Sequence, residues 1–398
     1  MHNKTILVSA YSCEPNRGSE PGVGWDYVSE MSKFYKLIVL TRDDKKEELE
    51  NEKLANIEFH YIKLPFFKKK SKYGFMAFFH YYLWQVWVFF YVKKNISLDN
   101  IKIIHHITFV NSWIPSFLVF FNKKFIWGPI GEHPIMPAEY FYNLPLNYYF
   151  KDRFKVFVRS FFKNIDVFFR ITKLKATSII CINNQVAKSF DVKKTTVIPA
   201  ISIDSKRFLN YQDLKKEKTG TFNIYWAGNV IYWKGIDLVI DSFIKFSENK
   251  NNVTLNIIGN GVDLDRIKIK ARENSKINFI PSMNQFDLFS FIQTQDLFFY
   301  PSFEGGGMIT LESMALGKPV LCLNFGGAGD MVKNNHNGIS LNYTNYNDII
   351  EGFVNALNMY YKSKTEISIH GKNSIMLVKE RFSVDFKINF FKNIYENF

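Results

Sequence analysis

PSFEGGGMITLESMALGKPVLCLNFGG, residues 301–327, is the stretch of this chain that decides the fold. Before its glycines, the run LFFYPS (297–302) is too short and too aromatic for a helix and predicts a buried strand. Three glycines then open a predicted helix at 308–316, and Pro319 begins a second buried strand. A glycine-rich turn between a strand and a helix leaves backbone N–H groups without partners at the positive end of the helix dipole. The stretch therefore predicts an anion-binding turn.

Two carboxylates frame this turn. Glu304 precedes the glycines, and Glu312 lies in the second turn of the predicted helix, eight positions later. Acidic side chains suit the hydroxyls of a sugar or a ribose better than a phosphate, because hydroxyls donate hydrogen bonds to carboxylates. The pattern indicates a site for sugar or ribose hydroxyls next to the anion-binding turn.

The two glutamates, followed by LESMALGKPVLC and a Gly-Gly turn, resemble the donor-site signature of glycosyltransferase family 4, whose members are retaining enzymes of the GT-B fold. The resemblance implies that Glu312 holds the ribose of a nucleotide and that Glu304 contacts the transferred sugar. It also implies that the amides of Gly306, Gly307 and Met308 bind the pyrophosphate. A plain Rossmann-type turn without this ligand is the alternative.

A second element, WAGNVIYWKG (226–235), supports the resemblance. In family 4 a similar element carries a glycine, an arginine and a lysine in fixed register, and the two basic residues bind the donor pyrophosphate. Gly228 and Lys234 keep that register, whereas Asn229 stands at the arginine position. We therefore expect phosphate binding and leaving-group stabilisation to rest on Lys234, with Asn229 limited to hydrogen bonding. The alternative is a solvated lysine before a helix.

The first half of the chain carries a weaker counterpart, GSEPGVG (18–24). It resembles the glycine loop that faces the donor phosphates and the acceptor in family 4, with a helix starting at residue 25. Gly22 and Gly24 would let the backbone approach the ligand closely. A simple turn is the alternative.

Histidines near a strand end are the remaining candidates for the donor site. In IIHHITF, His105 and His106 lie at the carboxyl end of a predicted strand, where many family 4 enzymes place a histidine against the donor sugar. Adjacent strand residues point to opposite faces, so only one of the two can face the site, and we favour His106 as catalytic. His133, beside Glu132 in GPIGEHP, is the competing candidate.

Strand-like and helix-length segments alternate in two series along the 398 residues. This alternation predicts an α/β protein with two doubly wound, Rossmann-like domains, as in the GT-B fold. We expect an acceptor-binding domain at 1–200, a polar linker near 204–220, and a nucleotide-sugar-binding domain at 201–381. The resemblance implies that the terminal helix, 382–398, crosses back to the first domain.

The composition limits which cofactors and which cellular compartment we expect. Three separated cysteines, Cys13, Cys181 and Cys322, form no C-x-x-C pair and predict buried thiols in the cytoplasm, and the N-terminus reads as a strand, without a signal peptide. Asp263 and Asp265 form D-x-D, but at a predicted helix start they complement the helix dipole. We therefore expect no metal and no cofactor beyond a nucleotide-diphosphate sugar as co-substrate.

A net charge of +14 with 41 phenylalanines suits an anionic partner, and two segments point to a membrane surface. The uncharged run 74–92 reaches the lower edge of a membrane span, but a span would divide the first series of strands. In 150–169, basic residues recur every four positions while phenylalanines gather on another side, as in a helix lying on an anionic membrane. A core-packed helix with a solvated basic face is the alternative. These residues are Lys151, Lys155, Arg159 and Lys163, and Phe150, Phe154, Phe157, Phe161 and Phe168.

The sequence as a whole predicts a metal-independent retaining glycosyltransferase of the hexosyltransferase type. It would move a sugar from a nucleotide-diphosphate sugar to a glycan or lipid-linked acceptor in cell-surface polysaccharide synthesis, peripherally on the inner face of the membrane. A GT-B sugar-nucleotide epimerase or hydrolase, or a basic membrane- or nucleic-acid-binding protein, are the alternatives. Nucleic acid is not an expected partner, because no helix-turn-helix, zinc-finger or RNP motif is visible.

Overall fold

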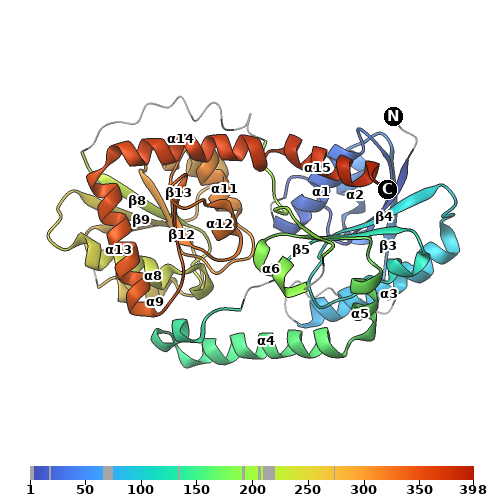
Figure 1. The fold of residues 1–398 in the computed structure, drawn as a ribbon, viewed down its shortest axis with the longest axis horizontal. Helices are drawn as coiled ribbons and strands as arrows, with labels where there is room; N and C mark the ends of the chain where they lie inside the picture. The colour runs from blue at the N-terminus through green and yellow to red at the C-terminus, as the bar shows by residue number, and fades with distance from the viewer. Residues whose placement is uncertain are drawn as a thin grey trace. The chain divides into compact units, whose positions relative to one another are not determined.

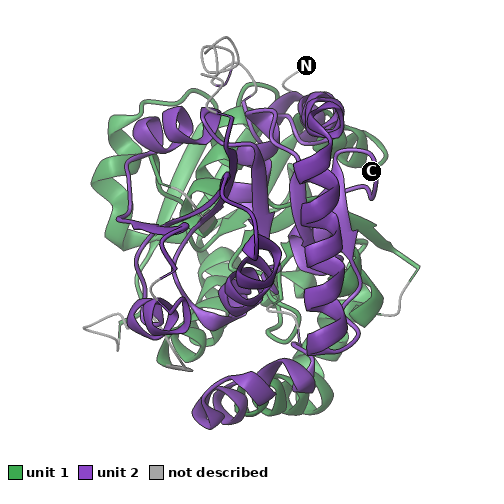
Figure 2. Cartoon of the chain, turned by 90° about the vertical axis from the view of Figure 1, so that its left-hand side faces the viewer, with its two compact units in different colours: residues 1–132, 153–200, 388–398 green, residues 133–152, 201–387 purple. Residues whose placement is uncertain are grey.

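The computed structural model describes residues 4–17, 19–65, 75–132, 135–190, 193–204, 208, 220–272 and 274–398. The chain forms two compact units, which Figure 2 colours separately. Unit 1 comprises residues 1–132, 153–200 and 388–398, and unit 2 comprises residues 133–152 and 201–387. The candidate His133, the first residue of the predicted loop 18–24, and nearly all of the predicted linker lie outside the described residues.

Unit 1 contains a seven-stranded sheet of order β3-β2-β1-β4-β5-β6-β7. Figure 1 labels β3, β4 and β5 among these strands. All neighbouring strands in it pair in parallel. The strands are β1 (Thr5–Ala10), β2 (Lys36–Arg42), β3 (Ile57–Ile62), β4 (Ile101–Thr108), β5 (Lys124–Ile130), β6 (Ser178–Cys181) and β7 (Thr195–Val197). The helical segments are α1 (Ser19–Met31), η1 (Asp43–Lys45), α2 (Lys46–Asn51), α3 (Phe75–Asn95), η2 (Phe117–Phe121), α5 (Val167–Lys175) and α6 (Asn184–Phe190).

Unit 2 contains a six-stranded parallel sheet of order β10-β9-β8-β11-β12-β13. The strands are β8 (Phe222–Ala227), β9 (Val253–Ile258), β10 (Ile277–Ile280), β11 (Leu297–Tyr300), β12 (Val320–Leu323) and β13 (Gly338–Leu341). The helical segments are η3 (Ala138–Asn143), η5 (Tyr232–Lys234), α8 (Ile236–Ser247), α9 (Leu264–Lys270), α10 (Gln285–Gln293), α11 (Met308–Ala315), α12 (Gly326–Met331), α13 (Tyr346–Lys362) and α14 (Lys364–Arg381). Two further helices contain residues of both units, α4 (Leu146–Ile165) and α15 (Val384–Glu396).

The prediction of two doubly wound parallel sheets is confirmed. Central strands such as β11 and β12 are buried along their whole length, as expected for strands covered by helices on both faces. The strand order reverses between β1 and β4 in unit 1 and between β8 and β11 in unit 2. The carboxyl ends of the strands at such a switch point are where open α/β sheets bind ligands.

The units differ from the predicted domains in two segments, 133–152 and 382–387, which both belong to unit 2. The first predicted domain, 1–200, includes residues 133–152, whereas the structure places them in unit 2. The physical reason is burial: Met136, Tyr140, Phe141 and Leu144 lie in the hydrophobic core of unit 2. At the other end of the chain, residues 388–398 belong to unit 1, where Phe391 and Tyr395 are buried.

Helix α3 accounts for most of the uncharged run 74–92. Tyr81, Trp84, Val88 and Val92, spaced three and four residues apart, are buried in the core of unit 1. Across the described part of the chain, no helix combines the length and hydropathy that a membrane span needs.

Helix α4 exposes most of its phenylalanines and turns part of its basic face inward. Four of its phenylalanines point outward, with exposed fractions between 48 and 67%, so the alternative of a core-packed apolar face is wrong. Two of the predicted basic residues turn inward instead. Arg159 lies 3.3 Å from Glu132, and Lys163 donates to Ser189 and has its pKa lowered by burial. The outward phenylalanines are Phe150, Phe154, Phe157 and Phe161.

Candidate functional site

The loops that follow β8 and β11 bring together two charged residues of unit 2. Lys234 ends η5, and its Nζ lies 3.4 Å from Oε2 of Glu304, which follows β11. The same carboxylate oxygen accepts a hydrogen bond from the Tyr300 hydroxyl (3.0 Å). The lysine side chain is 15% exposed and the glutamate 36%, so both reach solvent from a partly enclosed position. The structure thus pairs two residues that the sequence places seventy positions apart.

Tyr300 is a site residue that sequence reasoning missed. It is fully buried at the end of β11, and burial raises its pKa well above the usual range, with a further contribution from the Glu304 carboxylate. It therefore stays a neutral hydroxyl that donates to Glu304. The available signal was its position four residues before Glu304, at the last residue of a strand.

Two glycines in the element WAGNVIYWKG allow the turn that carries Lys234 to form. Gly235 has φ of +69°, and a Cβ there would lie 1.9 Å from the backbone oxygen of Pro301. Gly228 has φ of +149°, and a Cβ there would lie 3.4 Å from Nζ of Lys234. A larger residue at Gly235 would push the lysine turn away from β11, whereas at Gly228 it is the positive φ that disfavours a larger residue. The exposed Asn229 lies with its Oδ1 against Gly261 of the neighbouring turn.

The predicted glycine turn opens α11 as expected. Met308 is the first residue of the helix, Gly307 is its N-cap, and no side chain caps it. The first amides of an α-helix lack intrahelical partners, so this end can receive an anion. Gly306 is exposed, and an added Cβ would meet no atom within 4 Å. The space next to its backbone is therefore open.

The second glycine pair of the motif holds the first turn in place. The amide of Gly327 donates to the backbone oxygen of Glu304 (3.1 Å). A Cβ on Gly326 would lie 2.1 Å from that oxygen, and one on Gly327 would lie 1.9 Å from the oxygen of Gly306. Only glycines permit this contact between the α12 start and the turn before α11.

Glu312 occupies the second turn of α11, where the sequence predicts it. It is half-buried, and its Oε1 accepts a hydrogen bond from Gln285 (2.9 Å). The hydroxyl of Thr310, near the N-terminus of the same helix, is buried.

Lys318, which follows α11, stabilises a neighbouring helix. It donates hydrogen bonds to the backbone oxygens of Gln293 and Gln295 and so caps α10.

His105 and His106 are buried in unit 1. His106 is fully buried, and its Nε2 contacts the hydroxyl of Tyr81 (2.8 Å) on α3. His105 points to the opposite face, with Nε2 2.7 Å from the backbone oxygen of Gly128 and Nδ1 2.5 Å from the hydroxyl of Tyr395. Burial lowers the pKa of each to about 3. These placements argue against the predicted catalytic role of His106 and indicate core histidines that stay neutral.

The predicted loop 18–24 is wrong, because α1 begins at Ser19 and contains both glycines. Pro21 is tolerated in the first turn, where its missing N–H has no intrahelical acceptor. A Cβ on Gly22 would lie 2.1 Å from the oxygen of Arg17, and one on Gly24 would lie 2.2 Å from the oxygen of Ser12. The glycines therefore let α1 pack against the segment after β1.

Two glutamates, Glu20 of α1 and Glu132 after β5, lie near the carboxyl ends of β4 and β5, and the sequence analysis gave neither of them a role. Glu20 accepts from the amide of Phe109, just after β4. Glu132, after β5, accepts from the hydroxyl of Ser112 and pairs with Arg159. Each carboxylate thus already has partners within unit 1.

The cysteines and Asp263, the first acid of the D-x-D pair, are buried. Cys13, Cys181 and Cys322 are buried thiols, and burial raises the pKa of each, that of Cys181 to about 12. Asp263 is buried and contacts Tyr148 and Arg266. In the part of the chain that the structure describes, no three His, Cys, Asp or Glu side chains are grouped to hold a metal ion.

Comparisons with known proteins identify similar sequences and a similar fold. Residues 210–373 match the family model of the glycosyl transferases group 1. An uncharacterized glycosyltransferase of Methanocaldococcus jannaschii is 23% identical over 290 residues, which cover 70% of this chain and 69% of that protein. The capsular polysaccharide biosynthesis glycosyltransferase CapM of Staphylococcus aureus is 29% identical over 143 residues, 34% of this chain and 37% of CapM. The structure of Anabaena HepE in complex with UDP has a TM-score of 0.60, 16% identity and 99% coverage of both chains.

Proposed function

We propose that this chain, a glycosyltransferase with the GT-B fold whose residues 210–373 belong to the glycosyl transferases group 1, moves a hexose from a nucleoside-diphosphate sugar with retention of configuration. The acceptor in this proposal is a glycan or a lipid-linked glycan of cell-surface polysaccharide synthesis. UDP is the first nucleotide to test, because HepE was solved with it, and CapM supports a polysaccharide acceptor.

The observation that carries the proposal is the pairing of Lys234 with Glu304 beside the uncapped N-terminus of α11. A cation and free amides suit a diphosphate, and a carboxylate suits sugar hydroxyls. Glu304 would contact the transferred sugar, and Glu312 would hold the ribose. Gly306, Gly307 and Met308 would offer their amides to the pyrophosphate.

Charge stabilisation explains how these residues would accelerate transfer. Negative charge grows on the leaving phosphate as the bond to the sugar breaks, and a cation aimed at it gains strength in the transition state. Lys234 would supply that charge, since Asn229 brings none. In the proposed retaining reaction the leaving phosphate takes the proton of the acceptor hydroxyl on the same face, so the protein contributes positioning.

Saturable binding of a nucleotide tests this proposal. Calorimetry with UDP, ADP and GDP, and hydrolysis assays with the matching sugar nucleotides, should identify one base that binds and one sugar that is released or transferred. A matched control is Lys245→Ala, which removes an exposed lysine paired with Glu351, and it should bind like the wild type. Absence of binding by all three nucleotides would contradict the proposal.

We also propose that the reaction needs no divalent metal, because Lys234 and the α11 amides can neutralise the diphosphate. Activity should survive complete chelation by EDTA, after the same treatment has abolished a metal-dependent transferase run in parallel. Loss of activity with EDTA and its recovery with manganese would overturn this part.

The outward face of α4 and α5 supports a peripheral location on the anionic inner face of the cell membrane, in the cytoplasm. Phe154, Phe157, Phe161 and Phe168 are exposed, and Lys151 and Lys155 lie exposed among the phenylalanines. The two acids of 146–175 do not offer free charge there: Asp152 is buried, and Asp166 accepts from the amides of Phe168 and Phe169 as the N-cap of α5. Exposed aromatic and basic residues suit an anionic lipid surface, and neither Asp152 nor Asp166 adds an exposed acid without a partner that would repel it.

Sedimentation with vesicles tests this location. The wild type should bind vesicles that contain phosphatidylglycerol, and high salt should release part of it. Burying a phenylalanine contributes about 1.5–3 kcal/mol, so replacing both Phe154 and Phe157 with serine should weaken binding at least tenfold. Phe286→Ser, at an equally exposed phenylalanine of α10, is the matched control and should bind like the wild type. Equal binding by all three proteins would contradict the assignment.

A further inference from the structure

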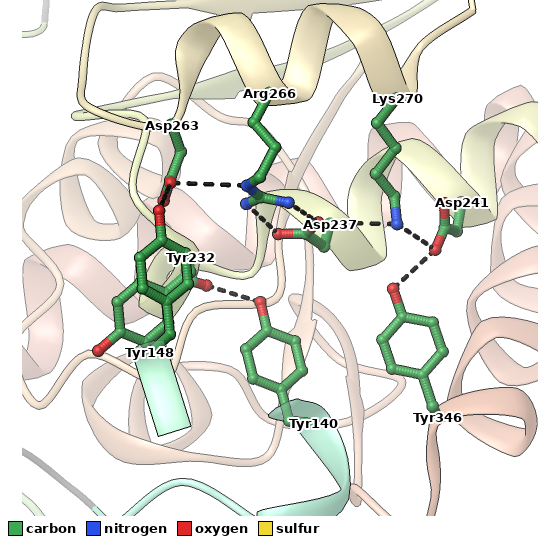
Figure 3. A network of polar contacts seen from close by, with 9 residues as sticks. All are labelled: Tyr140, Tyr148, Tyr232, Asp237, Asp241, Asp263, Arg266, Lys270 and Tyr346. Carbon is green, nitrogen blue, oxygen red and sulfur yellow. Dashed lines mark hydrogen bonds and ion pairs between the residues drawn. The ribbon is translucent and has the colours of Figure 1, made fainter. Parts of the chain in front are cut away.

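Residues 135–152, here called the strap, belong to unit 2, although the segments before and after them in the sequence belong to unit 1. The strap follows β5 of unit 1 and precedes the part of α4 that belongs to unit 1. Its apolar side chains nevertheless lie in the core of unit 2, where Met136 and Tyr140 have no exposed surface. Figure 3 shows the polar contacts that hold it there. The strap is therefore a component of the unit that carries Lys234 and Glu304.

One strap residue touches both loops of the proposed donor site. Tyr140 donates its hydroxyl to the backbone oxygen of Tyr232 (2.6 Å), two residues before Lys234. Its ring packs on the ring of Phe303, with centroids 4.6 Å apart, and Phe303 immediately precedes Glu304. A single fully buried side chain thus spans the segments that present the cation and the carboxylate.

A second strap residue contacts the same turn. The ring of Tyr148 stacks on that of Tyr232, with centroids 4.5 Å apart and planes inclined by 13° (Figure 3). Its hydroxyl donates to Asp263. Asp263 in turn lies 3.6 Å from Nε of Arg266, whose two Nη atoms bind the buried carboxylate of Asp237 at 2.6 and 2.8 Å. The stacked tyrosine is therefore anchored to α8 and α9.

The two loops are also joined directly, so that a shift in one moves the other. The amide of Phe303 donates to the backbone oxygen of Trp233 (2.9 Å), one residue before Lys234. Trp226 donates its indole N–H to the oxygen of Lys234 (3.3 Å). Hydrogen bonds thus connect the two segments that carry Lys234 and Glu304, and the strap tyrosines contact both Tyr232 and Phe303.

We propose that Tyr140 and Tyr148 are positioning residues of the donor site, acting on the Lys234–Glu304 pair through Tyr232 and Phe303. This inference rests on the proposed function, since it takes the pair as the group that meets the donor. A displacement of about 1 Å at a reacting centre can cost about a hundredfold in rate. Residues that fix the turn without touching the donor are thereby part of its catalytic geometry.

The test removes single hydroxyl groups and keeps the rings. Tyr140→Phe should lower kcat about three- to tenfold, the effect of one lost hydrogen bond, with a smaller change in KM. Tyr346→Phe is the matched control, because this tyrosine belongs to the same network and donates its hydroxyl to Asp241 (2.7 Å). Its ring stacks beside that of Tyr140, with centroids 6.4 Å apart, and phenylalanine keeps this ring contact. It should lower Tm about as much as Tyr140→Phe and leave kcat within twofold of the wild type.

A double-mutant cycle separates positioning from loss of stability. If Tyr140 acts through Lys234, the effect of Tyr140→Phe on kcat should largely disappear in a Lys234→Ala background, because the group that it positions is gone. Where residual turnover is too low, the affinity for the nucleoside diphosphate that the wild type binds serves as the second measurement. Tyr148→Phe should behave like Tyr140→Phe in both assays.

The outcomes distinguish this inference from the proposed function. A wild type that binds none of UDP, ADP and GDP and transfers no sugar overturns both. A wild type that is active and loses turnover with Lys234→Ala, while Tyr140→Phe matches Tyr346→Phe in kcat, overturns the strap inference alone. Fully additive effects of Tyr140→Phe and Lys234→Ala would also overturn it.

Discussion

Two glycine-rich segments, one in each unit, have opposite surroundings. In α1 of unit 1, Cβ atoms on Gly22 and Gly24 would lie 2.1 and 2.2 Å from backbone oxygens of the preceding loop. In the turn before α11 of unit 2, a Cβ on Gly306 would meet nothing within 4 Å. The first segment uses glycine to bring two backbones together, and the second leaves its backbone open to a ligand.

The charged and titratable residues follow the same division. In unit 2, Lys234 and Glu304 lie on loops beyond the strand ends and reach solvent. In unit 1, His105 and His106 lie within β4 and have no exposed surface. The comparison teaches that a motif residue must lie beyond the strand end, on an open loop, before it can serve a ligand. The predictions below test this contrast, from the largest expected effect to the smallest.

The largest effect is the pH dependence of the stability of unit 1. Burial lowers the pKa of His105 and His106 from 6.5 to about 3, so the unfolded chain binds more protons than the folded chain below pH 6.5. Their stabilising contribution is complete above pH 6.5 and is lost as the pH falls toward 3. At pH 5 the loss is about 2 kcal/mol for each histidine.

Hydrogen exchange of the β1 and β4 amides measures this loss within unit 1. Replacing His106 by Gln, which does not titrate, should remove about half of the pH dependence between pH 6.5 and 5. An exchange profile that does not change between these pH values would show that the histidines gain protons without unfolding, as residues of an open site would.

The next effect is the loss of turnover in Lys234→Ala. Removing one charged donor to a developing anion typically costs about a hundredfold or more in kcat, and the uncharged Asn229 offers no substitute. Lys234→Arg should recover part of the activity, limited by the shape of the guanidinium group. Steady-state kinetics with the identified donor measure both. Turnover of Lys234→Ala within a few-fold of the wild type would mean that another cation meets the phosphate, and Arg17, which pairs with Glu14, would be examined first.

A smaller effect is expected on stability from Gly24→Ala in α1. Alanine favours a helix over glycine by about 1 kcal/mol, but its Cβ would clash with the oxygen of Ser12 and with Thr108 (2.9 Å). Overpacking typically costs about 1–3 kcal/mol, so urea unfolding should show a less stable protein whose nucleotide affinity is unchanged. Gly352→Ala in α13 is the control, because its Cβ would meet only the end of the Leu341 side chain, and it should be tolerated. Selective loss of nucleotide binding in Gly24→Ala would restore the predicted role of this segment as a ligand loop.

The sequence allowed most of the fold to be predicted because the strands are apolar, short and separated by helix-length spacers. It also allowed the turn before α11 to be predicted, since glycines and carboxylates there are contiguous. The start of α1 was not predictable from local preference, because Gly22, Gly24 and Pro21 disfavour a helix that only tertiary packing selects. The strap was missed for a related reason: nothing local indicates which unit buries Tyr140. The outward phenylalanines of α4 could be read from periodicity as a face, but periodicity does not say what covers that face.

The two glutamates of the donor site should differ in what they bind. Glu312→Ala should weaken binding of the free nucleoside diphosphate roughly tenfold, if it holds the ribose through charge-assisted hydrogen bonds. Glu304→Ala should spare that binding and lower turnover, since it would contact only the sugar. Calorimetry and kinetics on the two variants check this, and Gln285→Ala, which removes the partner of Glu312, is the control for a purely structural effect. Equal losses of nucleoside-diphosphate affinity in both glutamate variants would contradict the assignment.

The smallest effect is expected from Gly306→Ala, and this variant gives the most direct test of the contrast between the two glycine-rich segments. Its φ is not in the left-handed region and its Cβ has free space, so alanine should leave Tm unchanged. A methyl group there would nevertheless occupy the space through which a diphosphate approaches the α11 amides. We expect nucleoside-diphosphate affinity to fall roughly fivefold, at the low end of an overpacking cost. Gly306→Ala would thus lose binding at constant stability, and Gly24→Ala would lose stability at constant binding. If Gly306→Ala binds the nucleotide like the wild type, no ligand comes close to this backbone, and the plain Rossmann-type turn becomes the correct interpretation of residues 301–327.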